Sequence, residues 1–228
     1  MKKMIRIKMN NAYIYIFVIF CIFFDTLSGQ NRVRKKLSEK EYAKMEIEKE
    51  CKLPESENII IWDEKYKLDI DDFWEKERNS KVKGNGNGYV CTGGIEISVL
   101  WDKAVIKVYA FVDKSKSWIN KKRSEEYIKY TLNHEQRHFD LAEIIARKLR
   151  RKIIRKFWFK ISLSCKDLRY IEQLYDEYRK IQNQYDSEIE KEGRSAQERW
   201  DKWIDEELER TKKWYNKHLV IVKRCRCK

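Results

Sequence analysis

The sequence contains few of the residues that interrupt regular structure. Its 228 residues include one proline and seven glycines, and no internal repeat is evident. Because proline breaks helices, its scarcity permits long ones, and Pro54 precedes every helix-like segment of the C-terminal half. Three glycines fall in residues 84–88. We expect a flexible hairpin tip there, since no helix opens directly after it, as a phosphate-binding glycine loop would require.

Long apolar runs are also absent, except near the N-terminus. Residues 12–24 are unbroken apolar sequence, too short to span a bilayer comfortably as a helix. Basic residues precede this run and small or polar residues follow it, which is typical of a secretory signal peptide. We expect residues 1–29 to be cleaved, leaving a secreted or periplasmic protein without a membrane span. An uncleaved anchor is the alternative. No cysteine stands where lipidation would need one.

Acidic residues are outnumbered by basic ones, and the formal net charge is +14. The lysines and arginines are spread along amphipathic segments and alternate with glutamates, whereas a nucleic-acid-binding protein concentrates them on one element. A nucleic-acid partner is therefore not expected. The charge favours contact with anionic surfaces, such as phosphate-rich envelope polymers or lipid head groups, although solubility alone is the simpler explanation.

Six cysteines are present, and Cys21 belongs to the export segment. Export to an oxidising compartment predicts disulfides among the other five. Cys51 with Cys91, and Cys165 with either Cys225 or Cys227, is one scheme of several that the sequence allows.

The expected elements divide the mature chain into a small sheet and a set of helices. Residues 30–57 are a charged leader or short helix, and residues 58–62 read as a strand. Two β-branched, aromatic runs within residues 94–112, separated by Asp102 and Lys103, predict an antiparallel hairpin. Residues 58–217 are expected to form a single domain, followed by a basic, cysteine-containing tail at residues 218–228.

Three helices are expected after the hairpin. The first runs from the N-cap Ser124 to about Arg155, and the others span residues 167–192 and 196–217, with Gly193 as the break. One face of the first helix is apolar except at two histidines. A polar pair on a core-facing stripe needs a buried partner, and a metal ion is one. That face comprises Tyr127, Tyr130, Thr131, His134, His138, Leu141, Ile145 and Leu149.

The two histidines belong to an H-E-x-x-H motif, residues 134–138, in a chain with only three histidines. Histidines four apart on a helix can bind one zinc ion, and Glu135 can take a proton from a metal-bound water. The fold expected around this helix is α+β and zincin-like, with a small antiparallel sheet and a C-terminal helical bundle. The alternative is a solvated helix face that carries two histidines by chance.

A third zinc ligand is needed, and the sequence offers several. Glu143 lies nine residues after His134, on the opposite side of a straight helix, so a structural role fits it better. His218 is the remaining histidine. An acid from the cluster Asp186, Glu188, Glu190 and Glu192 would complete a two-histidine, one-carboxylate site, although this run could equally be a solvated face.

The motif and its flanks resemble a bacterial family of unknown function described as predicted secreted zinc-dependent proteases. The resemblance rests on the segment L-N-H-E-Q-R-H-F-D-L-A-E at residues 132–143, with weaker matches at 61–73 and 185–200. In that family a histidine follows the Tyr-Asp pair, and this chain has none there. If that histidine is the family's third ligand, Glu192 is the first candidate substitute and Glu190 the second.

These observations predict a secreted zinc-dependent hydrolase. His134, His138 and Glu192 would hold Zn²⁺, and Glu135 would act as general base. A peptide or protein is the expected substrate. Two alternatives stay open. One is a zinc amidase that acts on cell-wall polymers, and the other is an inactive envelope protein with a binding or structural role.

Overall fold

The computed structural model describes residues 38–75, 88–100, 102–215 and 219–226. The predicted signal peptide at residues 1–29, residues 84–87 of the glycine loop and His218 lie outside the described residues. The α-helices are α1 (Glu39–Glu50), α2 (Glu125–Phe157), α3 (Cys165–Glu192) and α4 (Arg194–Thr211), with 3₁₀ helices η1 (Ile70–Asp72), η2 (Lys114–Lys116) and η3 (Lys212–Trp214). The strands are β1 (Ile59–Ile61), β2 (Trp74–Glu75), β3 (Gly88–Tyr89), β4 (Thr92–Gly93), β5 (Glu96–Leu100), β6 (Lys103–Val108), β7 (Phe111–Asp113), β8 (Trp118–Ile119), β9 (Ser162–Leu163) and β10 (Leu219–Cys225).

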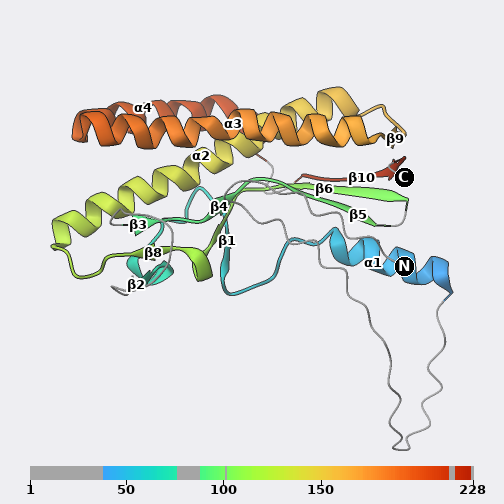
Figure 1. Ribbon diagram of the computed structural model, residues 1–228, viewed down its shortest axis with the longest axis horizontal. Helices are drawn as coiled ribbons and strands as arrows, with labels where there is room; N and C mark the ends of the chain where they lie inside the picture. Colours follow the sequence, from blue (N-terminus) through green and yellow to red (C-terminus); the bar gives the residue numbers. More distant parts are fainter. Residues whose placement is uncertain (1–37, 76–87, 101, 216–218, 227–228) are drawn as a thin grey trace, which may run out of the picture.

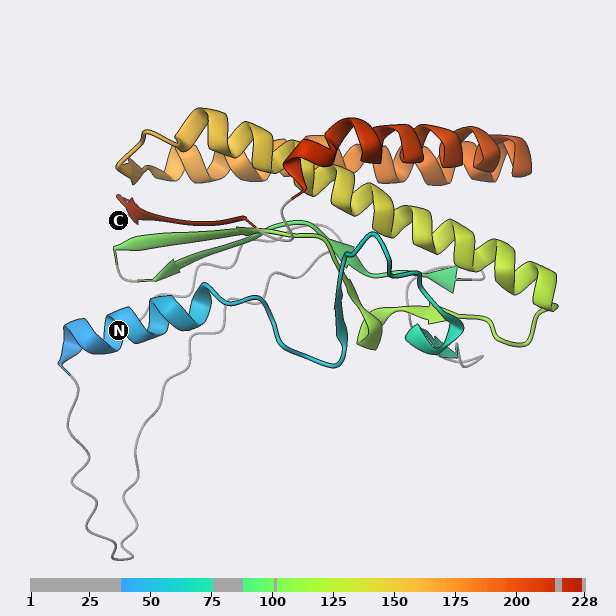
Figure 2. The same cartoon turned by 180° about the vertical axis from the view of Figure 1, so that it is seen from behind.

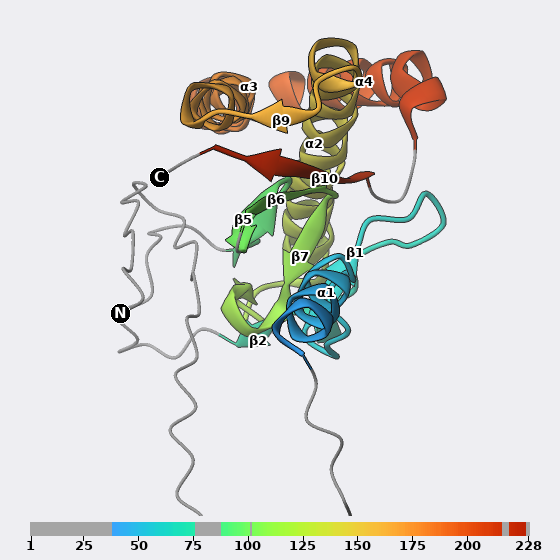
Figure 3. The same cartoon turned by 90° about the vertical axis from the view of Figure 1, so that its right-hand side faces the viewer.

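The elements form layers, which confirms the expected α+β class. Helices α2, α3 and α4 lie on one side of the strands, and α1 lies on the other, against β5 and β6 (Figures 1 and 2). Helix α2 contacts α3 and α4 as well as strands β3, β4, β6 and β7, and Figure 3 shows the upper part of α2 flanked by α3 and α4. Helix α2 is therefore packed on both sides, which explains why much of its length is buried.

The strands form three small sheets along one bent ribbon. Strands β3, β4 and β5 follow one another in the chain and pair antiparallel with β8, β7 and β6, respectively. Strands β2, β1 and β10 pair on the other side of the same three strands. Strands β3 and β4 also contact α2, so the ribbon brings backbone close to the H-E-x-x-H helix.

The predicted hairpin is confirmed for β5 and β6, where Ile97 pairs with Ile106 and Leu100 with Lys103. The second strand ends at Val108 rather than at residue 112. Residues 111–113 form the separate strand β7, which pairs with β1 and β4 instead of β5. The turn in the ribbon between β6 and β7 moves the chain from one sheet to the next.

The expected C-terminal tail is a strand over most of its length. Strand β10 lies between β6, to which it is antiparallel, and β9, to which it is parallel. Its first residues, Leu219 to Val222, are a β-branched apolar run, and Ile221 is buried against the core. The sequence places this run in a basic tail, and its pairing with β6 shows that it is a strand of the sheet.

The helices begin and end close to the predicted residues. Ser124 caps α2 by accepting a hydrogen bond from the Tyr127 backbone amide, and α2 continues two residues beyond Arg155. Gly193 separates α3 from α4 with φ of 65°, a conformation that favours glycine. Helix α4 ends at Thr211, earlier than expected. Within the described ranges, no helix combines the length and apolar composition that a bilayer crossing requires.

Glu143 has the structural role expected of it. Its buried carboxylate accepts hydrogen bonds from Arg147 Nε at 2.9 Å and from Arg150 at 2.9 and 3.2 Å. The two guanidinium groups also donate to the backbone carbonyls of Val108, Leu208 and Trp214. This network joins α2 to the sheet and to the end of α4 through fully buried charges.

The predicted disulfide between Cys51 and Cys91 is wrong, because both are free thiols. Cys51 ends α1, which packs on β5 and β6, whereas Cys91 lies between β3 and β4. Cys165 is disulfide-bonded. Cys225, one of its two predicted partners, is free.

Candidate metal centre

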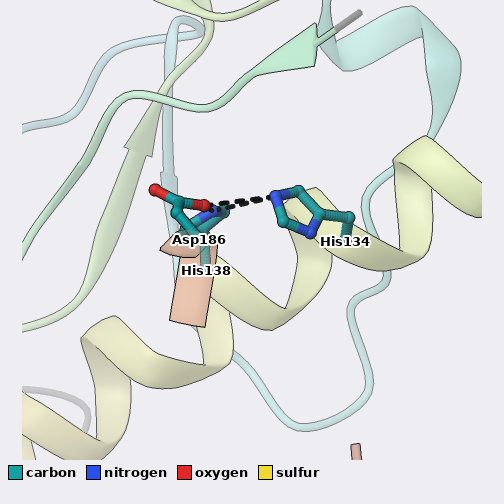
Figure 4. A group of neighbouring side chains, drawn as sticks. All are labelled: His134, His138 and Asp186. Atoms are coloured by element: carbon teal, nitrogen blue, oxygen red, sulfur yellow. Dashed lines mark hydrogen bonds and ion pairs between the residues drawn. The ribbon is translucent and has the colours of Figure 1, made fainter. Parts of the chain in front are cut away.

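Helix α2 carries His134 and His138 on one face, a single turn apart. Their rings are nearly perpendicular, with centroids 4.8 Å apart, and their Nε2 atoms approach to 3.2 Å. Figure 4 shows both rings directed toward the same point. This arrangement is the one that the four-residue spacing predicts.

The third member of the group is Asp186, from α3. Its Oδ1 atom lies 2.8 Å from His138 Nε2 and 3.4 Å from His134 Nε2 (Figure 4). Three potential ligand atoms from two helices thus lie within 4.8 Å of one another. The Asp186 side chain remains 56% exposed, so solvent reaches the group from the α3 side.

Glu192, the predicted third ligand, is not part of this group. Its carboxylate accepts a hydrogen bond from Arg199 of α4 at 3.1 Å. Six residues of helix turn the side chain by about 240° relative to Asp186, so the two acids leave α3 in different directions. Glu190, the second candidate, is exposed and also lies outside the group.

The helical spacing of α3 did not single out Asp186 as a ligand. The buried residues Leu168, Ile171, Leu174 and Tyr185 are spaced by sums of three- and four-residue steps and define the face that packs on α2. Asp186 directly follows the last of these residues. Continuing the periodicity seven residues beyond Tyr185 leads to Glu192, whereas Asp186 lies about 100° of helix rotation away from Tyr185, so the spacing along α3 did not favour Asp186.

Two glutamines hold the outer nitrogens of the histidines. Gln182 Oε1 lies 2.5 Å from His138 Nδ1, and Gln197 Oε1 lies 3.4 Å from His134 Nδ1. A carbonyl oxygen only accepts hydrogen bonds, so each Nδ1 must carry a hydrogen. In a neutral ring this leaves the Nε2 lone pair free to bind a metal.

The orientation of both glutamine amides is fixed because each Nε2 faces an oxygen that can only accept a hydrogen bond. Gln182 Nε2 donates to the His138 backbone carbonyl at 2.9 Å, and Gln197 Nε2 donates to Asp201 Oδ1 at 2.7 Å. The amide oxygens must therefore face the histidines. Asp201 also accepts from Arg137 Nε at 3.0 Å, which extends the network across α2, α3 and α4.

Tyr185 packs against both imidazoles. Its ring stacks on His134 with centroids 4.8 Å apart and meets His138 edge-on at 4.9 Å. Its hydroxyl and the Gln197 amide are within hydrogen-bond distance, so the tyrosine links the rings to α4. These contacts leave each ring little freedom to rotate.

Glu135 is 4% exposed and lies between α2 and the backbone of the β3–β4 segment. The Val90 backbone amide donates a hydrogen bond to its carboxylate. A Cβ at Gly88 would lie 2.7 Å from Glu135 Oε1, so glycine permits this close approach. Burial raises the pKa of Glu135, and the charges of the two histidines oppose that shift only in part. A carboxylate with raised proton affinity suits a general base.

The histidines and Asp186 perturb one another strongly. Burial alone would lower the pKa of His138, but the hydrogen bond and charge of Asp186, together with the charge of Glu135, raise it to about 9. Burial would raise the pKa of Asp186, but its hydrogen bonds to both histidines hold it far below its usual range. The site thus pairs a carboxylate with two histidines, and a bound metal cation would replace the proton that they share.

The three atoms fit a tetrahedral metal site. Metal–ligand bonds of about 2.0–2.2 Å place neighbouring tetrahedral ligands about 3.3–3.6 Å apart. The observed separations of 2.8, 3.2 and 3.4 Å are close to these values. Two imidazoles with one carboxylate also match the donor types that zinc accepts.

Comparisons with known proteins identified no relative of this chain. No protein-family model, no curated protein and no solved structure matches the chain. The resemblance to secreted zinc-dependent proteases and the zincin-like fold therefore stay predictions. The case for a metal centre depends on the side-chain geometry described above.

Proposed function

We propose that the protein is a zinc-dependent hydrolase that cleaves amide bonds in peptides. The observation that carries this proposal is the convergence of His134 Nε2, His138 Nε2 and Asp186 Oδ1 beside a buried Glu135. Export to the periplasm or the exterior, expected from the N-terminal segment, is part of the same proposal.

Each residue has a role that follows from its surroundings. Zinc bound by His134, His138 and Asp186 would lower the pKa of a coordinated water toward about 7. Glu135 accepts the proton of the attacking water and passes it to the leaving amine. Gln182 and Gln197 keep the histidine Nε2 atoms directed at the centre.

The neighbouring ribbon supports a peptide as the substrate. Within the described residues, β3 and β4 each pair with one strand only, and β3 lies beside Glu135 through Gly88. An extended peptide can add to the open side of such a strand through main-chain hydrogen bonds. The alternative substrate is an amide bond of a cell-wall polymer, which would be cleaved at the same metal centre without adding to a strand.

The test compares metal content and hydrolysis in matched variants. We expect about one zinc per chain, and hydrolysis of a broad peptide library that Glu135→Gln lowers by at least about 100-fold while zinc content is unchanged. Glu126→Gln, on the exposed face of the same helix, is the control and should keep full activity.

Other outcomes separate the alternatives. Cleavage of purified cell wall but not of peptides would identify an amidase. Zinc binding without hydrolysis of either substrate would favour a binding or structural protein, and absence of zinc after zinc-supplemented expression would refute the metal centre itself.

A further inference from the structure

The loop between α2 and β9 exposes three large apolar side chains. Trp158, Phe159 and Ile161 are 62%, 92% and 83% exposed, and only Lys160 interrupts them. Single exposed apolar residues are common on proteins, but a contiguous group at the tip of one short loop marks an interaction site. We call Trp158–Ile161 the apolar tip.

The apolar tip is held in place by buried residues on both sides. Phe157 and Leu163, which flank it, are fully buried. The Lys160 backbone amide donates to the Phe157 carbonyl at 3.1 Å, and Lys223 Nζ of β10 donates to the Trp158 carbonyl at 3.1 Å. The loop is thus fixed by the core behind it, while its side chains point outward.

A basic stripe leads along α2 to this tip. Lys148, Arg151, Lys152, Arg155 and Lys156 follow three- and four-residue steps and share one face of the helix. The last four are exposed. Arg151, Lys152 and Arg155 form no ion pair with any residue that the structure describes, so their charges are available to a partner.

A cationic cavity lies beside the stripe. It has a volume of about 300 Å³ between α2, α3 and the end of α4. Trp214 contributes to its lining, and the buried Nε1–H of this residue has no hydrogen-bond acceptor in the described part of the chain. The cationic residues of the lining are Arg147, Lys148, Arg151, Lys152, Arg210 and Lys213.

We propose that the apolar tip and the basic stripe dock the protein on a bilayer of anionic phospholipids. Trp and Phe are favoured at the boundary between head groups and acyl chains, and lysines and arginines near them attract anionic head groups. Arg151 and Lys152, which line the cavity and are exposed, offer their charges to a head-group phosphate. A second copy of the chain is a poor occupant, since it would bring an identical basic stripe against the first.

This surface is remote from the metal centre. The apolar tip follows the C-terminal end of α2, whereas His134 lies in the N-terminal part, about 35 Å away along the helix axis. Strand β2 lies at the end of the molecule opposite the tip (Figures 1 and 2). Docking through the tip therefore leaves the centre open, and the proposal does not depend on the proposed hydrolase activity.

Vesicle co-sedimentation of the full chain tests the proposal. We expect binding to phosphatidylcholine vesicles that contain about one third phosphatidylglycerol, and little binding to phosphatidylcholine alone. Phe159→Ser with Ile161→Ser should weaken binding at least about tenfold. Trp74→Ser with Val99→Ser removes comparable exposed apolar surface elsewhere and should leave binding unchanged.

Charge reversal tests the basic stripe in the same assay. Reversing Arg151, Lys152 and Arg155 to glutamate should weaken binding at least about 100-fold. Reversing Lys44, Lys129 and Lys202, three exposed lysines on other helix surfaces, changes the net charge equally and should have a much smaller effect. Residues 1–29 are identical in all variants, so their contribution cancels in each comparison.

A local probe identifies the surface that touches lipid. In protein labelled with 5-fluorotryptophan, nitroxide lipids should broaden the ¹⁹F signal of Trp158 and leave that of Trp74 sharp. The two signals are assigned with Trp158→Phe and Trp74→Phe. Equal broadening of both, unchanged vesicle binding by the tip variant, or a dimer in the absence of lipid that the tip variant abolishes would each overturn the proposal. Equally tight, tip-independent binding to a soluble polyanion would also overturn it.

Discussion

Replacing Gln182 with alanine removes the side chain that orients His138. Gln182 makes two hydrogen bonds to this residue: its Oε1 accepts one from Nδ1–H at 2.5 Å, and its Nε2 donates one to the backbone carbonyl at 2.9 Å. Losing partners of this kind lowers metal affinity by about 10- to 100-fold. This corresponds to about 1.4–2.8 kcal/mol of binding free energy, close to the value of two hydrogen bonds.

Zinc affinity is measured by competition with a chelating dye, and circular dichroism verifies the fold. Gln184→Ala is the matched control, because Gln184 lies on the exposed side of α3 and, among the residues that the structure describes, hydrogen-bonds only to Glu188. Gln182→Glu keeps an acceptor oxygen for Nδ1–H but loses the donor to the backbone carbonyl, so it should lower zinc affinity less than Gln182→Ala does. Equal affinities for the Gln182→Ala and Gln184→Ala variants would refute the assignment of Gln182 as a positioning residue.

Three further predictions concern other residues. Asp186→Ala should lower zinc affinity by at least about 100-fold, and Glu192→Ala should leave it unchanged, because only Asp186 lies beside the histidines. Glu143→Ala should lower the free energy of unfolding in urea by about 3–5 kcal/mol, because two buried guanidinium groups lose their carboxylate. Burial, followed by the charge of Glu96, raises the pKa of Tyr109, so the unfolded chain releases this proton first as pH rises. Stability should therefore fall from about pH 10 upward, and less steeply in Tyr109→Phe.

Each of these predictions has its own contrary result. If the Glu192→Ala variant lost zinc and the Asp186→Ala variant kept it, the third ligand would be Glu192, as the sequence predicted. The exposed Glu126→Ala should cost less than about 1 kcal/mol, and a cost equal to that of Glu143→Ala would remove the special role of the buried network. Identical alkaline stability curves for Tyr109→Phe and the natural chain would show that the tyrosine proton is not linked to folding.

Helix α2, which carries both histidines, could be predicted because the residues that define it are close together in the sequence. An N-cap at Ser124, the three- and four-residue spacing of apolar residues and the absence of proline define α2 almost to its ends. The same spacing placed His134 and His138 on one face and Glu143 on another. None of these inferences needed knowledge of which elements touch.

The third ligand could not be fixed in the same way, because it depends on the rotation of α3 against α2. Several acids of α3 lie within two turns, and a rotation of about 100° per residue decides which of them meets the histidines. The family that the sequence resembles has a histidine after the Tyr-Asp pair, and Glu192 was expected to replace that histidine. The packing of Tyr185 against both rings selects Asp186 instead.

Long-range pairing accounts for the remaining differences. Strand β10 is an interior strand only because β6 and β9 lie on either side of it, more than 50 residues away in sequence. The predicted disulfide between Cys51 and Cys91 does not form, because their elements belong to different parts of the fold. Spacing along the chain carries little information on such contacts.

The most direct test of the metal centre is anomalous scattering from zinc-soaked crystals. We expect a single strong peak about 2.0–2.2 Å from His134 Nε2, His138 Nε2 and a carboxylate oxygen of Asp186. A peak bound to other residues, or no peak at these three side chains at saturating zinc, would contradict it.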